Sequence, residues 1–212
     1  MKEIPHALYY QIFDLKPGKG EERKVRILEA FIKQIATKGL ENTSFETLGK
    51  AVKMKRTHIT YYFQTRDDLI RASVRYAVAV GQRMTIAQAE SARGWREKLK
   101  AVISGPFEWM AQFPEHASVM EMFYYLCSYD KKYRELQNSI RQMGEDRLVS
   151  CLEPWAEAEK LSLSEVRATA RRIQNLIVGA IINFHSSDYP GTLKELKGEV
   201  LVTSMKWIEG ER

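Results

Sequence analysis

The sequence predicts an all-α protein of about nine helices, with three short ones near the N-terminus and six mostly longer ones behind them. From Glu21 onward, apolar residues recur at the three- and four-residue spacing of amphipathic helices, and no segment alternates as a strand would. The chain has 212 residues, of which 44% are hydrophobic, and this is enough apolar material to bury a core. Disorder is therefore not expected.

The front of the chain predicts an irregular arm followed by a first helix. Residues 1–20 form the arm, because Pro5 and the run Pro17–Gly20 interrupt any periodicity. The helix should begin at Glu21 and end at Gly39, a residue type that commonly follows the last turn of a helix. Its apolar face is made by Leu28, Phe31, Ile32 and Ile35.

Two short helices are predicted next. Thr43 and Glu46 have the spacing of a capping box, in which the hydroxyl of the first accepts from the amide of the second. This predicts a helix over about 44–51. Another helix is predicted over about 56–63.

Six mostly longer helices complete the chain. We expect Gly105-Pro106 to kink or break the second of them, because proline lacks the N–H that a helix interior needs. The predicted ranges are 66–90, 94–112, 115–127, 131–157, 164–186 and 192–209.

The positive charge is concentrated near the N-terminus. Residues 19–75 hold 13 Lys and Arg against 7 Asp and Glu, which accounts for the whole net charge of +6. Within this segment, Lys50, Lys53, Lys55 and Arg56 follow one another without an acidic residue between them. Alone, such a patch favours a solvated face, although it also fits a polyanionic partner.

Several classes of protein are excluded by what the sequence lacks. The longest apolar run, Leu176–Phe184, has nine residues, so no membrane helix is expected, and no secretory signal pattern is present. The two cysteines, Cys127 and Cys151, cannot build a disulfide framework. We therefore expect a cytoplasmic protein.

No enzymatic activity, cofactor or metal is expected either. The sequence has no phosphate-binding glycine loop, no metal-spaced set of histidines and no nucleophile–base signature. His116 and His185 have acidic neighbours, but these are ordinary surface combinations.

The three front helices have the order of a helix-turn-helix unit. Two short helices follow a packing helix, and the second of the two begins inside the basic patch. Such a helix presents its N-terminal side chains to the major groove of DNA. Leu48, Ile59 and Phe63 are expected in the core of this small domain rather than at the DNA.

Residues 26–74 resemble the DNA-binding domain of the tetracycline-repressor (TetR-like) family of bacterial one-component regulators. The most specific part of the resemblance is the Tyr-Phe pair and its spacing from the next helix start. The matching segments are Ile27–Phe31, Gly39 with Thr43-Ser44, Leu48-Gly49, Ile59–Phe63 and Arg66–Leu69.

The resemblance implies a sequence-specific transcriptional regulator, and a repressor is favoured. Members of the TetR-like family bind a palindromic operator in double-stranded DNA as homodimers, and most of them bind a small molecule in a larger helical domain. On this basis we expect an N-terminal arm over 1–20, a helix-turn-helix domain over 21–65 and a dimerisation and ligand domain over 66–212. The alternative is a helical protein-interaction module without specific DNA binding.

The resemblance also implies roles for individual residues. By position, contacts to backbone phosphates would come from Thr43, Tyr62 and Arg66. The residues that would face the groove or its walls are Lys55, Arg56, Thr57, His58 and Tyr61.

The turn before the third helix departs from the family pattern. Lys53 stands where the family has glycine or another small residue, and a lysine held at positive φ costs about 1 kcal/mol. Lys55 stands where Ser or Thr caps the helix, so we expect the helix to begin later, with Thr57 as its cap. Thr57 and Thr60 replace a frequent glycine and the expected tyrosine.

The segment Leu176–Phe184 is apolar nearly all round, which predicts burial on more than one side. Together with the last helix it could form a four-helix bundle with a symmetric partner, or it could be the centre of the monomer. The residues predicted at the dimer interface are Ile173, Ile177, Ala180, Ile181, Phe184, Leu196, Val200 and Trp207.

Residues 107–125 are rich in methionine and aromatic residues. Such residues pack on one another in cores, and they also line adaptable apolar cavities. For an apolar or aromatic effector, the predicted lining residues are Trp109, Phe113, Phe123, Tyr124, Cys127 and Met143.

Overall fold

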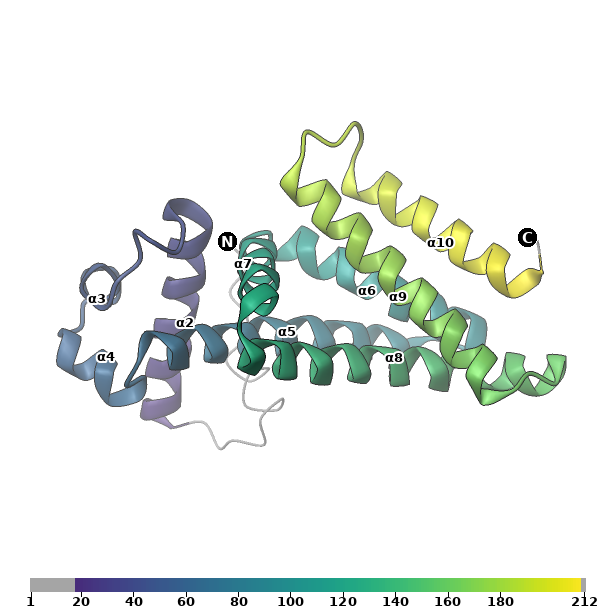
Figure 1. Ribbon diagram of the computed structural model, residues 1–212, viewed down its shortest axis with the longest axis horizontal. Helices are drawn as coiled ribbons and strands as arrows, with labels where there is room; N and C mark the ends of the chain where they lie inside the picture. The colour runs from purple at the N-terminus through teal and green to yellow at the C-terminus, as the bar shows by residue number, and fades with distance from the viewer. Residues whose placement is uncertain (1–17, 211–212) are drawn as a thin grey trace. The chain divides into compact units, whose positions relative to one another are not determined.

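The computed structural model describes residues 18–210, and these form helices and no strands, as predicted (Figure 1). The predicted arm over 1–20 lies almost entirely outside the described residues, since α2 begins at Lys19. The helices of the described part are α2 (Lys19–Lys38), α3 (Phe45–Val52), α4 (Arg56–Tyr62), α5 (Arg66–Ser91), α6 (Gly94–Gln112), α7 (Glu115–Tyr129), α8 (Lys131–Glu159), α9 (Leu163–Ser186) and α10 (Leu193–Glu209). None of them combines the length and the apolar character that a membrane crossing requires.

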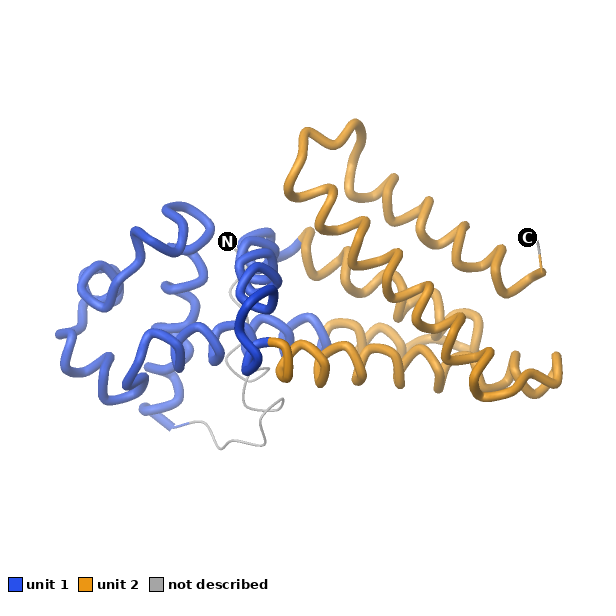
Figure 2. The backbone as a smooth tube through the Cα atoms, viewed as in Figure 1, with its two compact units in different colours: residues 1–83, 112–133 blue, residues 84–111, 134–212 orange. Residues whose placement is uncertain are grey.

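The chain divides into two compact units (Figure 2). Unit 1 contains the residues up to Arg83 together with Gln112–Tyr133, and unit 2 contains Met84–Ala111 together with the residues from Arg134 onward. Helices α5 and α8 each contribute to both units. The functional division predicted at residue 65 is a different boundary, and it stays a prediction.

Unit 1 is organised around α2. Helix α2 packs against α3 and α7, and α3 packs against α4. The apolar face predicted for α2 is buried as expected, and Leu48 of α3 and Ile59 of α4 are fully buried with it. Burying these side chains together holds two short helices that would be unstable alone.

The corner between α2 and α3 differs from the prediction by one residue. Ser44, not Thr43, caps α3: its hydroxyl accepts from the Thr47 amide at 3.1 Å, and the Thr47 hydroxyl accepts from the Ser44 amide at 2.9 Å. Thr43 instead donates to the Gly39 carbonyl at 2.9 Å, which closes the end of α2. The capping box predicted between Thr43 and Glu46 was therefore wrong. Thr47 takes the place expected for Glu46, because a threonine hydroxyl can accept a hydrogen bond from the cap amide as a carboxylate does.

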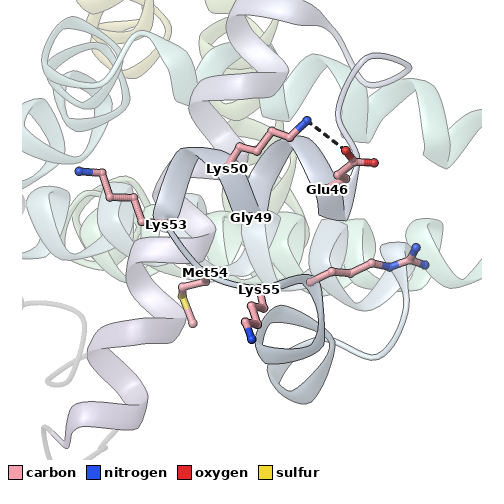
Figure 3. Close-up of a pocket in the computed structure, with 7 residues that line it drawn as sticks. Glu46, Gly49, Lys50, Lys53, Met54 and Lys55 are labelled. Carbon is pink, nitrogen blue, oxygen red and sulfur yellow. Dashed lines mark ion pairs between the residues drawn. The ribbon is translucent and has the colours of Figure 1, made fainter.

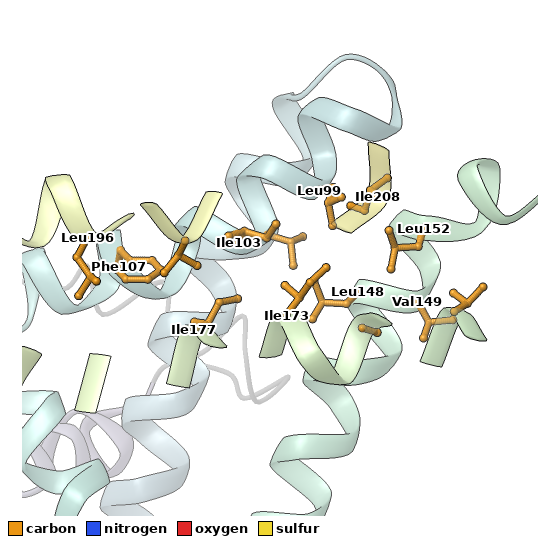
Figure 4. Close-up of a cluster of buried hydrophobic side chains, with 14 residues drawn as sticks. Leu99, Ile103, Phe107, Leu148, Val149, Leu152, Ile173, Ile177, Leu196 and Ile208 are labelled. Carbon is orange, nitrogen blue, oxygen red and sulfur yellow. The ribbon is translucent and has the colours of Figure 1, made fainter. Parts of the chain in front are cut away.

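Unit 2 has a continuous apolar core contributed by α6, α8, α9 and α10 (Figure 4). Figure 4 shows side chains from these helices converging in one cluster. The labelled members are Leu99, Ile103, Phe107, Leu148, Val149, Leu152, Ile173, Ile177, Leu196 and Ile208.

Helix α6 runs from Gly94 to Gln112 with Pro106 inside it, so the predicted break is not observed. Ile103 and Phe107 are buried on either side of the proline. Burial of both outweighs the hydrogen bond that proline cannot make. Gly105 serves close packing instead, because a Cβ added there would lie 2.2 Å from Oγ1 of Thr85 in α5.

Four residues predicted at a dimer interface lie in the core of unit 2. These are Ile173, Ile177, Leu196 and Val200, all of them buried within the single chain. Ala180, Ile181 and Phe184 are half-buried and pack against the same core, whereas Trp207 is 37% exposed. Helical periodicity marks a buried face without showing what covers it, and in the single chain the core of unit 2 covers these four, while the predicted interface itself stays a prediction.

Candidate nucleic-acid interface

Helix α4 exposes a polar face while one side chain anchors it. Ile59 is fully buried, and Phe63, which follows the helix, is buried as well. Tyr61 is 81% exposed, whereas Thr60 and Tyr62 are half-buried. The other predicted DNA-facing residues are also exposed, namely Lys55, Arg56, Thr57 and His58. The structure therefore leaves five of the predicted site residues exposed in and just before α4.

The three predicted phosphate contacts are placed differently from one another. Tyr62 is half-buried and packs edge-on against Tyr61, with ring centroids 5.2 Å apart. Arg66 is exposed, and its guanidinium donates to the Leu40 carbonyl. Thr43 is only 2% exposed and its hydroxyl is bonded to Gly39, so this side chain does not join the exposed surface.

The turn between α3 and α4 is tight because Gly49 permits it. The amides of Lys53 and Met54 both donate to the Gly49 carbonyl. A Cβ on Gly49 would lie 2.7 Å from the Met54 carbonyl oxygen, which is closer than real contacts allow. The chain then reverses at Lys53, whose φ of 55° and ψ of 45° lie in the left-handed region, so the cost considered for a lysine at this position applies.

Helix α4 begins at Arg56, so the later start with Thr57 as cap was wrong. Lys55 has the extended backbone of a cap residue, but its side chain makes no capping hydrogen bond. Its carbonyl still accepts from the His58 amide at 2.9 Å. The backbone of the turn thus begins the helix without help from a cap side chain.

The start of α5 is fixed by its own capping box. The Thr65 amide and hydroxyl donate to the Asp68 carboxylate at 3.0 and 2.7 Å, and the Asp68 amide donates to the Thr65 hydroxyl at 3.0 Å. Hydrogen bonds from Thr65 hold the pKa of Asp68 below its usual range. Arg66, which follows the cap, is therefore attached to a well-defined helix end.

A shallow hollow of about 400 Å³ lies beside the turn, and its lining is strongly cationic (Figure 3). It is lined by Glu46, Gly49, Lys50, Lys53, Met54, Lys55 and Arg56. Lys50 pairs with Glu46 at 3.0 Å, and this hydrogen bond lowers the pKa of the carboxyl. The predicted site set omitted Lys50 and Lys53, although the unbroken run of cations in the sequence could have included them.

The six predicted effector-lining residues do not fall in one compact unit. Trp109 and Met143 belong to unit 2, and the other four belong to unit 1. Phe113 is buried and stacks on His116 with centroids 5.2 Å apart, while Phe123 is fully buried against Tyr133. These two side chains act as core residues of unit 1.

Residues 18–210 contain no group of three or more His, Cys, Asp and Glu side chains arranged to hold a metal ion. The chemistry that the exposed surface of α4 offers is hydrogen bonding and positive charge. Those are the groups that phosphate oxygens and the acceptors of base edges bind.

Comparison with known proteins agrees with this geometry. Residues 27–73 match the family described as bacterial regulatory proteins, tetR family. The match spans the later part of α2, all of α3 and α4, and the start of α5. A comparison with curated protein sequences finds no match.

Solved structures match over most of the chain. A TetR transcription regulator from Haloarcula marismortui has a TM-score of 0.76 at 12% identity, over 89% of this chain and 97% of that one. A protein from Saccharomonospora viridis in complex with choline has a TM-score of 0.74 at 17% identity, over 84% and 93%. AibR, in complex with isovaleryl coenzyme A and operator DNA, has a TM-score of 0.65 at 14% identity, over 85% and 97%.

The family match over residues 27–73 supports a DNA-binding transcriptional regulator with a TetR-like helix-turn-helix domain. The match ends at the start of α5, and beyond it the similar solved structures show a shared all-helical fold.

Proposed function

We propose that this protein is a sequence-specific repressor that binds a palindromic operator as a homodimer in the cytoplasm. The observation that carries the proposal is the exposed face of α4. Ile59 anchors the helix, and Arg56, His58 and Tyr61 are left free to enter a major groove. A repressor follows most simply, because a protein bound across a promoter blocks transcription.

The homodimer is proposed to form through the outward faces of α9 and α10. Several small or apolar residues on these helices are absent from the core of unit 2, namely Val178, Gly179, Ile182, Gly198 and Val202. A Cβ added at Gly179 or Gly198 would meet nothing within 4 Å, so both positions leave room for a partner backbone. Two copies related by a twofold axis would bury these faces in a four-helix bundle.

An apolar or aromatic effector is proposed to control DNA binding through unit 1. Helix α7 carries Phe123, Tyr124 and Cys127 and packs against α2. Helix α2 in turn holds α3, because the Gln34 amide donates to the Thr47 carbonyl at 3.1 Å. A ligand that displaced α7 would therefore shift the helix-turn-helix group. The choline and isovaleryl coenzyme A complexes of similar structures support a small-molecule effector, while its apolar or aromatic character rests on the residues of α7 alone.

The test is fluorescence anisotropy with duplexes from the DNA upstream of the coding region, at several salt concentrations. Binding is expected to fall steeply as salt rises. Arg56→Ala is expected to weaken binding by about 5- to 100-fold, and Tyr62→Phe is expected to weaken it less. Arg93→Ala, an exposed cation in unit 2, is the matched control and should bind as the wild type does.

If neither Arg56→Ala nor Tyr62→Phe changes the affinity, the assigned surface is wrong. If the wild type binds no duplex specifically, the protein-interaction module becomes the better interpretation.

A further inference from the structure

The two lysines of the helix-turn-helix turn occupy positions where another residue would stabilise the fold. Lys53 lies at φ 55°, in the left-handed region that favours glycine. Lys55 lies at the cap position of α4 and makes no side-chain hydrogen bond there, where Ser, Thr, Asn or Asp would make one. Both residues are exposed, so neither gains packing energy in return.

Backbone strain at Lys53 and a missing capping bond at Lys55, both kept at exposed positions, indicate that function requires these side chains. The property required is positive charge, because both lysines line the same cationic hollow with Lys50 and Arg56. Glu46 neutralises Lys50 at 3.0 Å, whereas no ion pair within the described residues involves Lys53 or Lys55. The turn therefore carries unneutralised positive charge in addition to that of α4.

We propose that Lys53 and Lys55 form a second phosphate-binding element, which grips the sugar–phosphate backbone beside the groove that α4 enters. Figure 3 shows the two side chains extending in different directions from the turn, so each would contact a separate phosphate. This inference rests on the proposed DNA binding, and it adds contacts that carry affinity without reading sequence.

The experiment measures the dissociation constant against salt concentration for a random-sequence duplex of about 30 base pairs and for the genomic operator. Each phosphate contact contributes about 0.9 to the slope of the logarithm of the binding constant against the logarithm of the salt concentration. Lys53→Gly and Lys55→Ser should each lower the slope by about 0.9 per subunit on both duplexes. Each variant should also raise Tm by about 1–3 °C, because strain is relieved or a cap is gained.

Lys160→Gly is the matched control. Lys160 is the other non-glycine residue with positive φ among residues 18–210, at φ 56°, and it lies exposed in the turn after α8, in unit 2. Its substitution should raise Tm in the same way and leave the salt slope unchanged. Lys53→Arg should keep the slope of the wild type, since the charge is retained.

A gain in Tm combined with a loss of slope is an outcome that a purely structural role of these lysines would not produce. Unchanged slopes for both Lys53→Gly and Lys55→Ser would overturn the proposal while leaving DNA binding intact. An equal loss of slope in Lys160→Gly would also overturn it, because net charge alone would then explain the effect. Failure of the wild type to bind either duplex would overturn the proposed function itself.

Discussion

The Tyr133 hydroxyl donates a hydrogen bond to the Asp67 carboxylate, which joins the start of α8 to the first turn of α5 within unit 1. Tyr133 is 3% exposed, and burial together with Asp67 raises its pKa above the ordinary range. Asp67 also pairs with Arg71. Since Arg66 lies in the same turn, this contact helps to fix a predicted phosphate-binding residue.

Tyr133→Phe should lower the free energy of unfolding by about 1 kcal/mol, because it removes one hydrogen bond and leaves the ring in place. Denaturant unfolding at pH 7 measures the effect. Tyr125→Phe is the control, since Tyr125 is largely exposed, and its effect should stay within about 0.5 kcal/mol. Equal effects of the two variants would show that the bond to Asp67 contributes nothing.

Stability should fall on mild acidification because of His116. This side chain is 2% exposed, so the surface position predicted for it was wrong, and burial lowers its pKa from 6.5 to about 4. Below pH 6.5 the unfolded chain binds a proton that the folded protein rejects, so the stability present above pH 6.5 is lost as the pH falls toward 4. The full loss is about 3 kcal/mol.

His116→Gln, which has no titrating group, should unfold with a shallower dependence on pH over that window. The measurement is urea unfolding of both proteins at several pH values. If wild type and variant have parallel profiles, His116 is not the group that titrates.

Gly105→Ala should destabilise unit 2 by about 1–3 kcal/mol, because the new methyl group would overlap Thr85. The added Cβ would lie within 2.8 Å of three Thr85 side-chain atoms, so no rotation of that side chain removes the clash. Gly20→Ala, at an open position in α2, should instead be neutral or stabilising. Thermal unfolding compares the two.

The double variant Gly105→Ala/Thr85→Ala should lose less stability than the sum of the single losses. Strict additivity would exclude the hydroxyl and methyl groups of Thr85 as the cause, because alanine keeps only the Cβ at 2.7 Å.

The dimer proposal predicts that Gly179→Arg/Val202→Glu sediments as a monomer at micromolar concentration and binds operator much more weakly. Both positions are exposed in the single chain, so the fold itself should tolerate the changes. Leu163→Glu, at an exposed apolar residue in the first turn of α9, is the control and should remain dimeric. A double variant that remains dimeric would move the interface away from these faces.

Local signals in the sequence predicted most of the helix-turn-helix group. The short helix expected over 56–63 is α4, and the turn before it, where the sequence departs from the family pattern, holds Lys53 at positive φ. Both features depend on residues nearby in the sequence. Burial of Ile59 anchors α4, and Gly49 permits the tight turn at Lys53. Capping was less predictable, because Thr43 and Ser44 are adjacent hydroxyl residues and only the fold decides which of them turns inward.

Tertiary packing decided what the local signals could not. The sequence of Ile173 and Ile177 has the same periodicity whether a core or a partner covers that face, and here the core of unit 2 covers it. Pro106 is a local helix breaker, yet burial on both sides keeps α6 continuous.

The most direct test of the account is selection of genomic DNA fragments bound by the purified protein, followed by sequencing. We expect enrichment of an inverted repeat whose half-sites are centred about 10–10.5 base pairs, or a multiple of that, apart. The enrichment should be lost in Arg56→Ala. Enrichment of no sequence, or of one without twofold symmetry, would contradict the claim that a pair of α4 helices reads successive major grooves.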